Sequence, residues 1–366
     1  MFPFDAHHPS IVGLDIGTAS IKAVELRRAG KGWNLHRIGF KSLPPKAVTN
    51  GKIKDKEIVV QLLRDLWTEA RFGSKRVAIA VGGPSVIIKR IQLPLMTELD
   101  LEDQISLEAE EHIPFDIEDV YLDFQILGRT GEQMDVLLSA CKKELVDNRL
   151  EAPREAGLNP VLCDLDLFCV ANAFESFCMP TAKKPQAKKT PPPEKGEKGE
   201  ATALINIGSA HLNVAIIANG MPDFTRDHAF GSERMVQEIM QNQGISFEAA
   251  ELLIQQHKES QNSAWPPENR TPIVQSFLDQ LGNLVKQSVE FYQTGHTNQA
   301  VSTIYLSGGC AILPEMVSTL NEFLNLPVRT ANPLAGVHGK IPTTVPAETS
   351  PSFMVAMGLA VRGDAK

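Results

Sequence analysis

The sequence predicts an α/β fold of two related lobes. Three observations lead to this prediction: a repeated hairpin, an alternation of strands with helices, and a polar break between the halves. LDIGTASIKAVEL (14–26) aligns with INIGSAHLNVAII (205–217) when Gly17 is set on Gly208. Such a repeat indicates two structural copies. The chain has 366 residues, 43% of them apolar, which suffices for two or three packed domains.

The composition narrows the functional classes. The net charge is −8, which argues against a nucleic-acid-binding protein but leaves room for a local basic patch. Five cysteines without a CxxC pair fit a reducing compartment. The start, MFPFDAHHPS, has no signal-peptide pattern, and no apolar run reaches the roughly 18–20 residues that span a bilayer. We therefore expect a cytoplasmic protein whose contact with a membrane goes through a partner.

The elements of the first half follow from hydrophobic periodicity and from Gly and Pro stops. The helix expected over 98–112 combines several signals: Thr97 and Asp100 form an N-terminal capping box, one face is apolar and one acidic, and Pro114 ends it. In chain order we expect a hairpin over 11–26, a helix over 57–73, strands over 76–83 and 86–94, the helix over 98–112, strands over 120–127 and 134–143, a helix over 144–157, a strand over 160–166 and an apolar helix over 167–178.

The composition breaks after residue 180. TAKKPQAKKTPPPEKGEKGE (181–200) has only two alanines as apolar residues, so we expect a disordered or extended linker over 181–201. It is either a solvated insertion or a basic arm that touches acidic lipid. After the second hairpin we expect helices over 232–243, 246–260 and 271–294, a buried strand in VSTIYLSGGCAILP (301–314) that meets a Gly-Gly turn and a helix, and a closing apolar helix over 353–363.

The turn of the first hairpin is a candidate phosphate site. Gly17 and its small neighbours Thr18 and Ser20 leave backbone N–H groups open to a phosphate. Asp15 ends the first strand, where it can reach a hydrated Mg²⁺ beside that phosphate, because magnesium prefers one or two carboxylates together with phosphate oxygens. Lys22 returns on the second strand and can offset phosphate charge. One such turn is a weak signal, whereas two copies are more specific.

The second hairpin keeps the shape of the first and loses its charges. Asn206 stands where Asp15 stands, and Asn213 stands where Lys22 stands. Asn206 can coordinate a cation through its oxygen, but it brings no charge and cannot act as a base. His211 has no other ligand nearby at metal-binding spacing, so we interpret it as an ordinary turn residue.

The order of these motifs resembles that of the actin, heat-shock chaperone and sugar kinase superfamily. LDIGTASIK and INIGSAH resemble its two phosphate motifs, and IYLSGGCAILP, with Gly308 and Gly309, resembles its adenosine motif. VLCDLDLFCVANAFE and PSFMVAMGLAVRG resemble its two connecting segments. Within the superfamily, EAEEHIPF followed by LLSACKKE is similar to the inserted subdomain of the PilM family of type IV pilus assembly, which is related to FtsA. The resemblance covers roughly 10–180 and 202–363.

The resemblance implies a two-lobed actin-like ATPase fold, a duplicated ribonuclease H-like unit with a small inserted α+β subdomain. The first lobe is expected over 10–85 with 158–180 and 351–363, the inserted subdomain over 86–157, and the second lobe over 202–350. The resemblance also implies ATP or ADP with Mg²⁺ between the lobes. The residues expected to hold the nucleotide are Asp15, Gly17, Thr18, Ser20, Lys22, Gly208, Ser209, Glu251, Gly308 and Gly309.

Departures from the family pattern point to weak or absent hydrolysis. Asn206 replaces the usual Asp, and Ile254 stands where a Lys usually contacts the nucleotide. Alternation puts Asp164 and Asp166 on one side of a strand, where each can orient water or hydrated Mg²⁺ or cap a helix. Asp164 is the candidate catalytic residue. An empty, vestigial cleft is the alternative to nucleotide binding.

The resemblance further implies a partner at the inner membrane. PilM proteins bind the cytoplasmic N-terminal peptide of PilN, a bitopic pilus protein, so we expect a PilN-like partner and contacts with pilus motor or platform components. We expect the peptide between the first lobe and the inserted subdomain, bordered by the strand at 86–93 and by Ile113, Pro114 and Phe115. An adaptor peripheral to the inner membrane is the leading interpretation. A sugar-type kinase on the same fold and an FtsA-like division or filament protein are alternatives, and a related role in type II secretion stays open.

Overall fold

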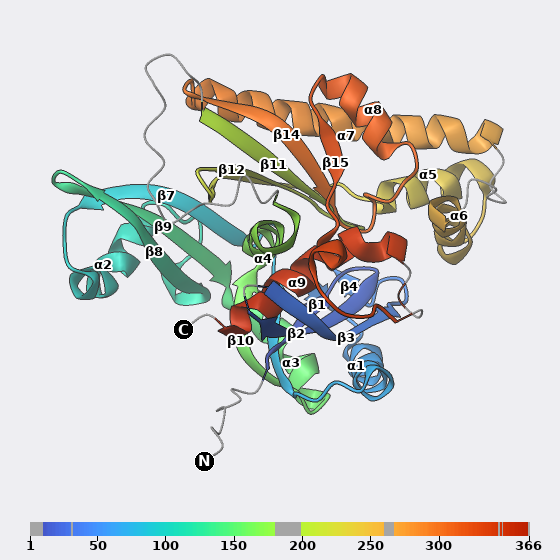
Figure 1. Cartoon of the computed structure of the whole chain (residues 1–366), viewed down its shortest axis with the longest axis horizontal. Coiled ribbons are helices and arrows are strands. Elements are labelled where there is room, and N and C mark those ends of the chain that lie inside the picture. The colour runs from blue at the N-terminus through green and yellow to red at the C-terminus, as the bar shows by residue number, and fades with distance from the viewer. Residues whose placement is uncertain are drawn as a thin grey trace.

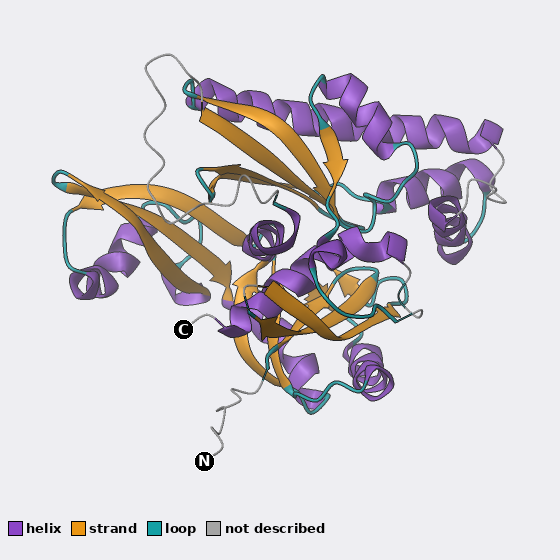
Figure 2. Ribbon diagram, in the orientation of Figure 1, coloured by secondary structure: helices purple, strands orange, loops and turns teal. Residues whose placement is uncertain are grey.

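The computed structural model describes residues 10–30, 32–179, 199–259, 267–342, 345 and 347–364. Two five-stranded sheets form separate lobes, and a sheet of three strands forms a smaller body beside the first lobe (Figure 1). Helices cover the outer faces of the large sheets, and two further helices lie between the lobes (Figure 2).

The sheet of the first lobe has the strand order β10-β6-β1-β2-β3. β1 and β2 are antiparallel, as are β2 and β3, whereas β1 runs parallel to β6 and β6 runs parallel to β10. Two helices, α1 and α3, pack on this sheet. The bounds are β1 (Val12–Ile16), β2 (Ser20–Ala29), β3 (Gly32–Ser42), β4 (Val48–Thr49), β5 (Lys52–Ile53), α1 (Lys56–Ala70), β6 (Arg76–Val81), α3 (Lys143–Glu155) and β10 (Asn159–Leu165).

The sheet of the second lobe repeats this plan strand by strand, in the order β13-β12-β11-β14-β15. β11, β12 and β13 are antiparallel neighbours, and β11, β14 and β15 are parallel neighbours. The predicted duplication is therefore confirmed. The bounds are β11 (Gly199–Ile207), β12 (Leu212–Ala218), β13 (Met221–His228), α5 (Glu233–Gln243), α6 (Phe247–Glu259), α7 (Pro267–Gly295), β14 (Gln299–Ser307), α8 (Met316–Leu324) and β15 (Val328–Thr330).

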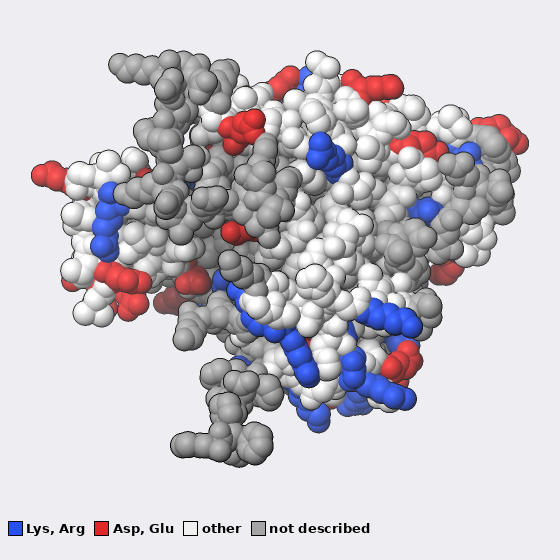
Figure 3. Space-filling view, viewed as in Figure 1, with Lys and Arg blue, Asp and Glu red and all other residues white. Residues whose placement is uncertain are grey.

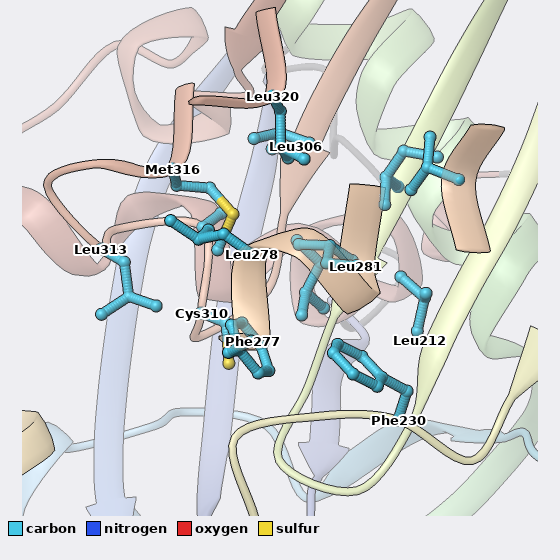
Figure 4. Close-up of a cluster of buried hydrophobic side chains, with 14 of the residues drawn as sticks. Leu212, Phe230, Phe277, Leu278, Leu281, Leu306, Cys310, Leu313, Met316 and Leu320 are labelled. Carbon is cyan, nitrogen blue, oxygen red and sulfur yellow. The ribbon is translucent and has the colours of Figure 1, made fainter. Parts of the chain in front are cut away.

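The core of the second lobe is built on the long helix α7. Phe277, Leu278 and Leu281 from α7 belong to one buried cluster with Leu306 of β14 and Leu320 of α8 (Figure 4). All five side chains are nearly inaccessible to solvent. Burying a side chain of this size contributes about 1.5–3 kcal/mol relative to exposure, so this cluster fixes α7 and α8 on the sheet.

The inserted subdomain is an antiparallel sheet, β7-β9-β8, covered by one helix, α2. The predicted capping box is present: Thr97 Oγ1 accepts a hydrogen bond from the Asp100 N–H at 3.2 Å, and Asp100 Oδ2 accepts one from the Thr97 N–H at 3.3 Å. The chain enters after β6 and returns to the first lobe through α3. The bounds are β7 (Val86–Pro94), α2 (Glu98–Glu110), β8 (Val120–Thr130) and β9 (Gln133–Lys142).

Two apolar helices, α4 (Asp166–Ala173) and α9 (Met354–Val361), lie between the lobes (Figure 1). α9 packs on β1 and β2, and α4 packs on β11 and β12. The helices touch at Gly358, where any Cβ would overlap the backbone carbonyl of Cys169. The helix pair therefore depends on glycine at this position.

Several sequence-based boundaries change. The strand expected over 160–166 ends at Leu165, and the helix expected over 167–178 passes into a π turn over Phe174–Cys178. Of the linker predicted over 181–201, residues 181–198 lie outside the described residues, whereas 199–201 already belong to β11. In the described part of the chain, no helix is long and apolar enough to cross a membrane.

Candidate nucleotide cleft and partner groove

The turn between β1 and β2 carries an ion pair at its base. The Gly17 N–H donates to the Ser20 carbonyl oxygen at 2.9 Å, which closes the turn. Asp15 and Lys22 face each other across the two strands, and Lys22 Nζ lies 3.0 Å from Asp15 Oδ2. Lys22 is nearly buried, so the pair is held in one geometry at the cleft.

The turn between β11 and β12 has the same backbone closure with different chemistry. The Gly208 N–H donates to the His211 carbonyl oxygen at 2.9 Å. Asn206 and Asn213 occupy the register of the ion pair in the first turn, and Asn206 Nδ2 donates to Asn213 Oδ1 at 3.1 Å. Asn213 Nδ2 in turn donates to Asp227 Oδ1 at 2.7 Å. An amide ladder thus replaces the ion pair.

Both turns line one cleft of about 720 Å³, which lies within the range of small-molecule sites. Gly308 follows β14 at a φ of +88°, and a Cβ there would lie 2.3 Å from the Ile207 carbonyl oxygen, so only glycine fits this turn. The structure brings together all ten residues that the sequence singled out: Asp15, Gly17, Thr18, Ser20, Lys22, Gly208, Ser209, Glu251, Gly308 and Gly309.

Asp166 is not among the site residues predicted from the sequence. In the structure it lines this cleft. Burial raises the pKa of Asp166 to about 7, and the negative charge of Asp15 contributes to this rise. Gly82 leaves room for this carboxylate, because a Cβ on Gly82 would lie 2.3 Å from Asp166 Oδ2. The cleft therefore holds two carboxyls, Asp15 and Asp166, at the end of the first sheet.

Arg149 was not identified from the sequence. It extends from α3 into the cleft, is 8% exposed, and its Nη1 donates to the backbone carbonyl of Ile16. Burial lowers the pKa of Arg149, while Asp166 and Asp15 favour its charged form. In the sequence, Arg149 stands out as a charged residue on an otherwise apolar face of its helix. Only the fold shows that this face lies next to the cleft.

Two further side chains of the second lobe reach the cleft. Lys258 on α6, seven residues after Glu251, lines the cleft. This helix therefore still supplies a cation, although Ile254 stands where the family usually has a lysine. His211 lies close to Gly83, where a Cβ in place of the glycine hydrogen would be 3.6 Å from the imidazole ring. Burial lowers the pKa of His211, so its ring is neutral near pH 7.

The sequence-based placement of Asp164 in the cleft does not hold. Asp164 Oδ2 lies 3.0 Å from Arg362 Nε, and both residues line a different cavity. The expectation that Asp164 and Asp166 share one side fails because β10 ends at Leu165 and helix geometry begins at Asp166. Asp164 therefore does not reach the site where we expected it to orient water.

The cleft can hold magnesium only together with a ligand that brings oxygens. Among the described residues there is no group of three or more His, Cys, Asp or Glu side chains that could hold a metal ion. Asp15 and Asp166 supply two carboxyls, and magnesium is commonly bound by one or two carboxylates with phosphate oxygens and water. The donor set thus fits a hydrated Mg²⁺ carried by a polyphosphate.

The sequence predicts a partner groove bordered by the strand at 86–93 and by Ile113, Pro114 and Phe115. In the structure these three residues do not share a groove with that strand. Ile113 is 5% exposed and belongs to the core of the inserted subdomain. Phe115 lies under Lys142, whose Nζ is 4.3 Å from the ring centroid. The hollow that contains Ile113, Pro114 and Phe115 is lined mainly by charged side chains, and β7 does not border it.

Another groove, of about 700 Å³, lies between the inserted subdomain, the end of β10, α4 and the start of β13. The run 121–125 of β8 lines it without interruption. Successive side chains of a strand point to opposite faces, so an uninterrupted run means that the edge of β8 faces the groove. In its sheet β8 pairs only with β9, which leaves this edge open among the described residues.

Comparison with known proteins decides the family. The model of the family described as type IV pilus assembly protein PilM matches residues 13–364. The chain belongs to the PilM family. A solved PilM–PilN type IV pilus biogenesis complex is similar at a TM-score of 0.80 and 26% identity, covering 98% of this chain and 99% of that one.

More distant relatives agree with the fold of this PilM-family chain. Cell division protein FtsA of Bacillus subtilis is 23% identical over 354 residues, which is 88% of this chain and 78% of FtsA. MreB 5 of Spiroplasma citri, solved with bound AMPPNP, is similar at a TM-score of 0.50 and 13% identity, covering 96% and 95% of the two chains. The predicted actin-like fold is therefore confirmed.

Proposed function

We propose that this chain is an adaptor of type IV pilus assembly that binds the cytoplasmic N-terminal peptide of a PilN-like inner-membrane protein. The observation that carries the proposal is the match to the PilM family over residues 13–364, together with the likeness to a PilM–PilN complex. The protein would then work in the cytoplasm, peripheral to the inner membrane through this partner.

The groove beside β8 is the proposed peptide site. An extended peptide can pair its backbone with an open strand edge and place alternate side chains in pockets. Leu122, Phe168 and Met221 supply apolar lining from three different elements, and Met221 is 46% exposed. The carboxylates of Asp123, Asp164 and Glu175 also line the groove, which favours a peptide with a basic side chain.

We further propose that the cleft binds ATP or ADP with Mg²⁺ and that hydrolysis is slow. The two Gly turns would hold phosphates, Lys22 would offset their charge, and Asp15 would reach the hydrated magnesium. Glu251 would meet the ribose beside Gly308. Asn206 brings no carboxylate to the second turn, so the cleft has a weaker means of activating water.

The adaptor proposal is tested by a fluorescence-anisotropy titration with labelled N-terminal peptides of the membrane proteins encoded beside this gene. Met221→Glu places a charge in the groove and is expected to weaken binding at least about tenfold, which corresponds to ~1.4 kcal/mol. Leu99→Glu is the matched control, because Leu99 is 70% exposed on α2 and does not line the groove. Phe115→Ala tests the competing location.

Each outcome of this titration has a defined meaning. Loss of peptide binding in Met221→Glu, with binding retained in Leu99→Glu and Phe115→Ala, supports the groove beside β8. Loss with Phe115→Ala alone supports the first predicted location instead. If none of the peptides binds, the adaptor proposal fails, and a robust transfer of phosphate to a small sugar would favour the kinase alternative.

The nucleotide proposal is tested separately, by calorimetry with ATP and Mg²⁺ on protein shown to be free of carried-over nucleotide. Asp15→Ala is expected to reduce the dependence of affinity on magnesium, because it removes one of two carboxyls near the first turn. An absence of heat and of thermal shift at millimolar nucleotide would mean that the cleft is vestigial.

A further inference from the structure

The charges of this acidic chain are distributed unevenly. Residues 10–80 contain fourteen Lys and Arg against six Asp and Glu, a formal net charge of +8. Residues 86–142, which form the inserted subdomain, contain four Lys and Arg against thirteen Asp and Glu, a formal net charge of −9. Figure 3 shows Lys and Arg side chains gathered over the first lobe, where β2, β3 and α1 lie in Figure 1.

Part of this positive charge gathers at the end of the first sheet that points away from the cleft. The register places Arg37 opposite Glu25, Glu25 opposite Val12, and Val12 opposite Val77, which forms one row across the sheet. The cleft lies at the other end, three residues along β2, at Lys22. The cations at or beyond this row, which we call the basic pole, are Arg27, Arg28, Arg37, Arg71, Lys75 and Arg76.

The members of the basic pole lie close together in space. Arg37 Nε donates to the carbonyl oxygen of Arg71 at 3.3 Å, which joins β3 to the end of α1. Arg28 lies over the ring of Trp33, 4.5 Å from its centroid. Arg27, Arg71 and Lys75 are exposed. The pole is thus a continuous surface made by a hairpin tip and the loop before β6.

Acidic side chains of the first lobe do little to neutralise the pole. Glu25 is 1% exposed and accepts a hydrogen bond from Ser10 Oγ, and its contact with the pole is a long one, 3.8 Å from Arg27 Nη2. Glu69 pairs with Lys41 at 2.6 Å, outside the pole. For Arg71 and Lys75, no ion pair is found among the described residues. Both cations are therefore available to a partner.

We propose that the basic pole docks on the anionic surface of a lipid bilayer and so orients the protein on the membrane. Each Lys or Arg near such a surface contributes about 1 kcal/mol of attraction, which decays within a Debye length of roughly 8–10 Å. The inserted subdomain, with its net charge of −9, is repelled by the same surface. Opposite charges on two parts of one molecule set an orientation as well as an affinity.

The choice of lipid as the partner rests on the proposed function. The Asn159 N–H donates to the Lys75 carbonyl oxygen at 2.7 Å, so β10 starts at the pole. Asp164, five residues along this strand, lines the peptide groove, which is about 17 Å away at ~3.3 Å per residue. A peptide that emerges from the bilayer needs only a short span to reach the groove when the pole lies on the membrane.

The experiment measures co-sedimentation of the full chain with vesicles of phosphatidylethanolamine and phosphatidylglycerol, and with vesicles of phosphatidylcholine alone. The anionic vesicles are expected to bind the protein at low salt and to lose it as salt rises. The double variant Arg71→Glu with Lys75→Glu is expected to lower the partition coefficient about thirtyfold or more. Because the vesicles carry no peptide, failure here is distinguishable from failure of the peptide titration.

The matched control is Arg129→Glu with Arg329→Glu, which changes the net charge equally on exposed residues of the inserted subdomain and the second lobe. Retention of vesicle binding by this control, with loss in the pole variant, supports the proposal. Equal loss in both variants, equal binding to neutral vesicles, or no binding at low salt would overturn it. The proposal is also overturned if the pole variant still binds anionic vesicles and instead loses self-association, measured by sedimentation, or binding to a DNA duplex.

Discussion

Asp164 and Asp166 are separated by a single residue and line two different cavities. The strand ends between them, so the alternation that would keep both on one face does not continue. The carboxylate of Asp164 lies 3.0 Å from Arg362 at the peptide groove, whereas Asp166 lies near Asp15 in the nucleotide cleft. One strand end therefore supplies one carboxyl to each proposed site.

This arrangement predicts a clean separation of two phenotypes. Asp164→Asn is expected to weaken peptide binding about threefold to tenfold, as loss of one charge contact does, with nucleotide affinity unchanged. Asp166→Asn is expected to reduce magnesium-dependent nucleotide affinity, with peptide affinity unchanged in the absence of nucleotide. Paired anisotropy and calorimetry on both variants check this. Equal effects on both ligands would contradict the separation.

The raised pKa of Asp166 predicts a dependence on pH. Since burial raises this pKa from its ordinary value near 4 to about 7, the folded state binds a proton that the unfolded state has released between these two pH values. The free energy of unfolding therefore falls as pH rises from about 4 to 7, and the penalty is complete above that range.

The measurement is chemical denaturation of the wild type and of Asp166→Asn across this pH range. The variant cannot ionise, so it is expected to be more stable than the wild type at pH 8 by up to about 4 kcal/mol. The difference should shrink as the pH falls toward 4. Parallel stability curves for the two proteins would show that Asp166 does not titrate in this window.

The two Gly turns show which parts of the site could be read from the sequence. The alignment of Gly17 with Gly208 identified both turns, and the Gly-Gly pair identified Gly308 and Gly309 as further lining residues. These residues are local in the chain, so local pattern carries the information. Arg149 comes from a helix that returns from the inserted subdomain, and its role depends on a contact 133 residues away in sequence, which no local pattern contains.

The fold shows the same limit. The strands of both hairpins were expected because their apolar runs are long, whereas β3, β13 and β15, which lie at the sheet edges, were not identified. β15 has only three residues, and β13 is mostly polar and partly exposed at a sheet edge. Such edge strands form because a neighbour offers hydrogen bonds, and their own sequence preference is weak.

The hydrogen bonds between Asn206, Asn213 and Asp227 predict the effect of introducing a charge into the second turn. Asn206→Asp alone replaces a donor with a carboxylate oxygen opposite Asn213 Oδ1, so two acceptors face each other. We expect a loss of about 1–2 kcal/mol in the free energy of unfolding, because a partly buried hydrogen bond is lost and an unsatisfied acceptor remains. Thermal or chemical denaturation measures this loss.

The double variant Asn206→Asp with Asn213→Lys reproduces the pairing seen between Asp15 and Lys22. It is expected to recover most of the stability, since the new lysine also faces Asp227. If the missing carboxylate limits hydrolysis, the double variant should hydrolyse ATP faster than the wild type in a phosphate-release assay. Recovery of stability without faster hydrolysis would place the limitation elsewhere in the cleft.

Helix α3 predicts a coupling between the two proposed sites. Val146 and Leu150 on one face of α3 line the peptide groove, while Arg149 reaches into the cleft and donates to the carbonyl oxygen of Ile16. A helix held at both sites can transmit a shift only if each ligand prefers one of its positions. Nucleotide is therefore expected to change peptide affinity by a factor of about 5–150, the usual range of such couplings.

Arg149→Met removes the hydrogen bond to the first turn and leaves both groove-lining residues in place. It is expected to bring the ratio of peptide affinities with and without Mg²⁺ and ATP close to one, while peptide affinity without nucleotide is unchanged. Arg149→Lys is the matched control, because it keeps the buried charge beside Asp15 and Asp166 without the fork of a guanidinium. Linkage requires that peptide alter nucleotide affinity by the same factor, so the cycle is measured from both directions. A wild-type ratio in Arg149→Met, at nucleotide concentrations shown to saturate that variant, would mean that α3 does not connect the two sites.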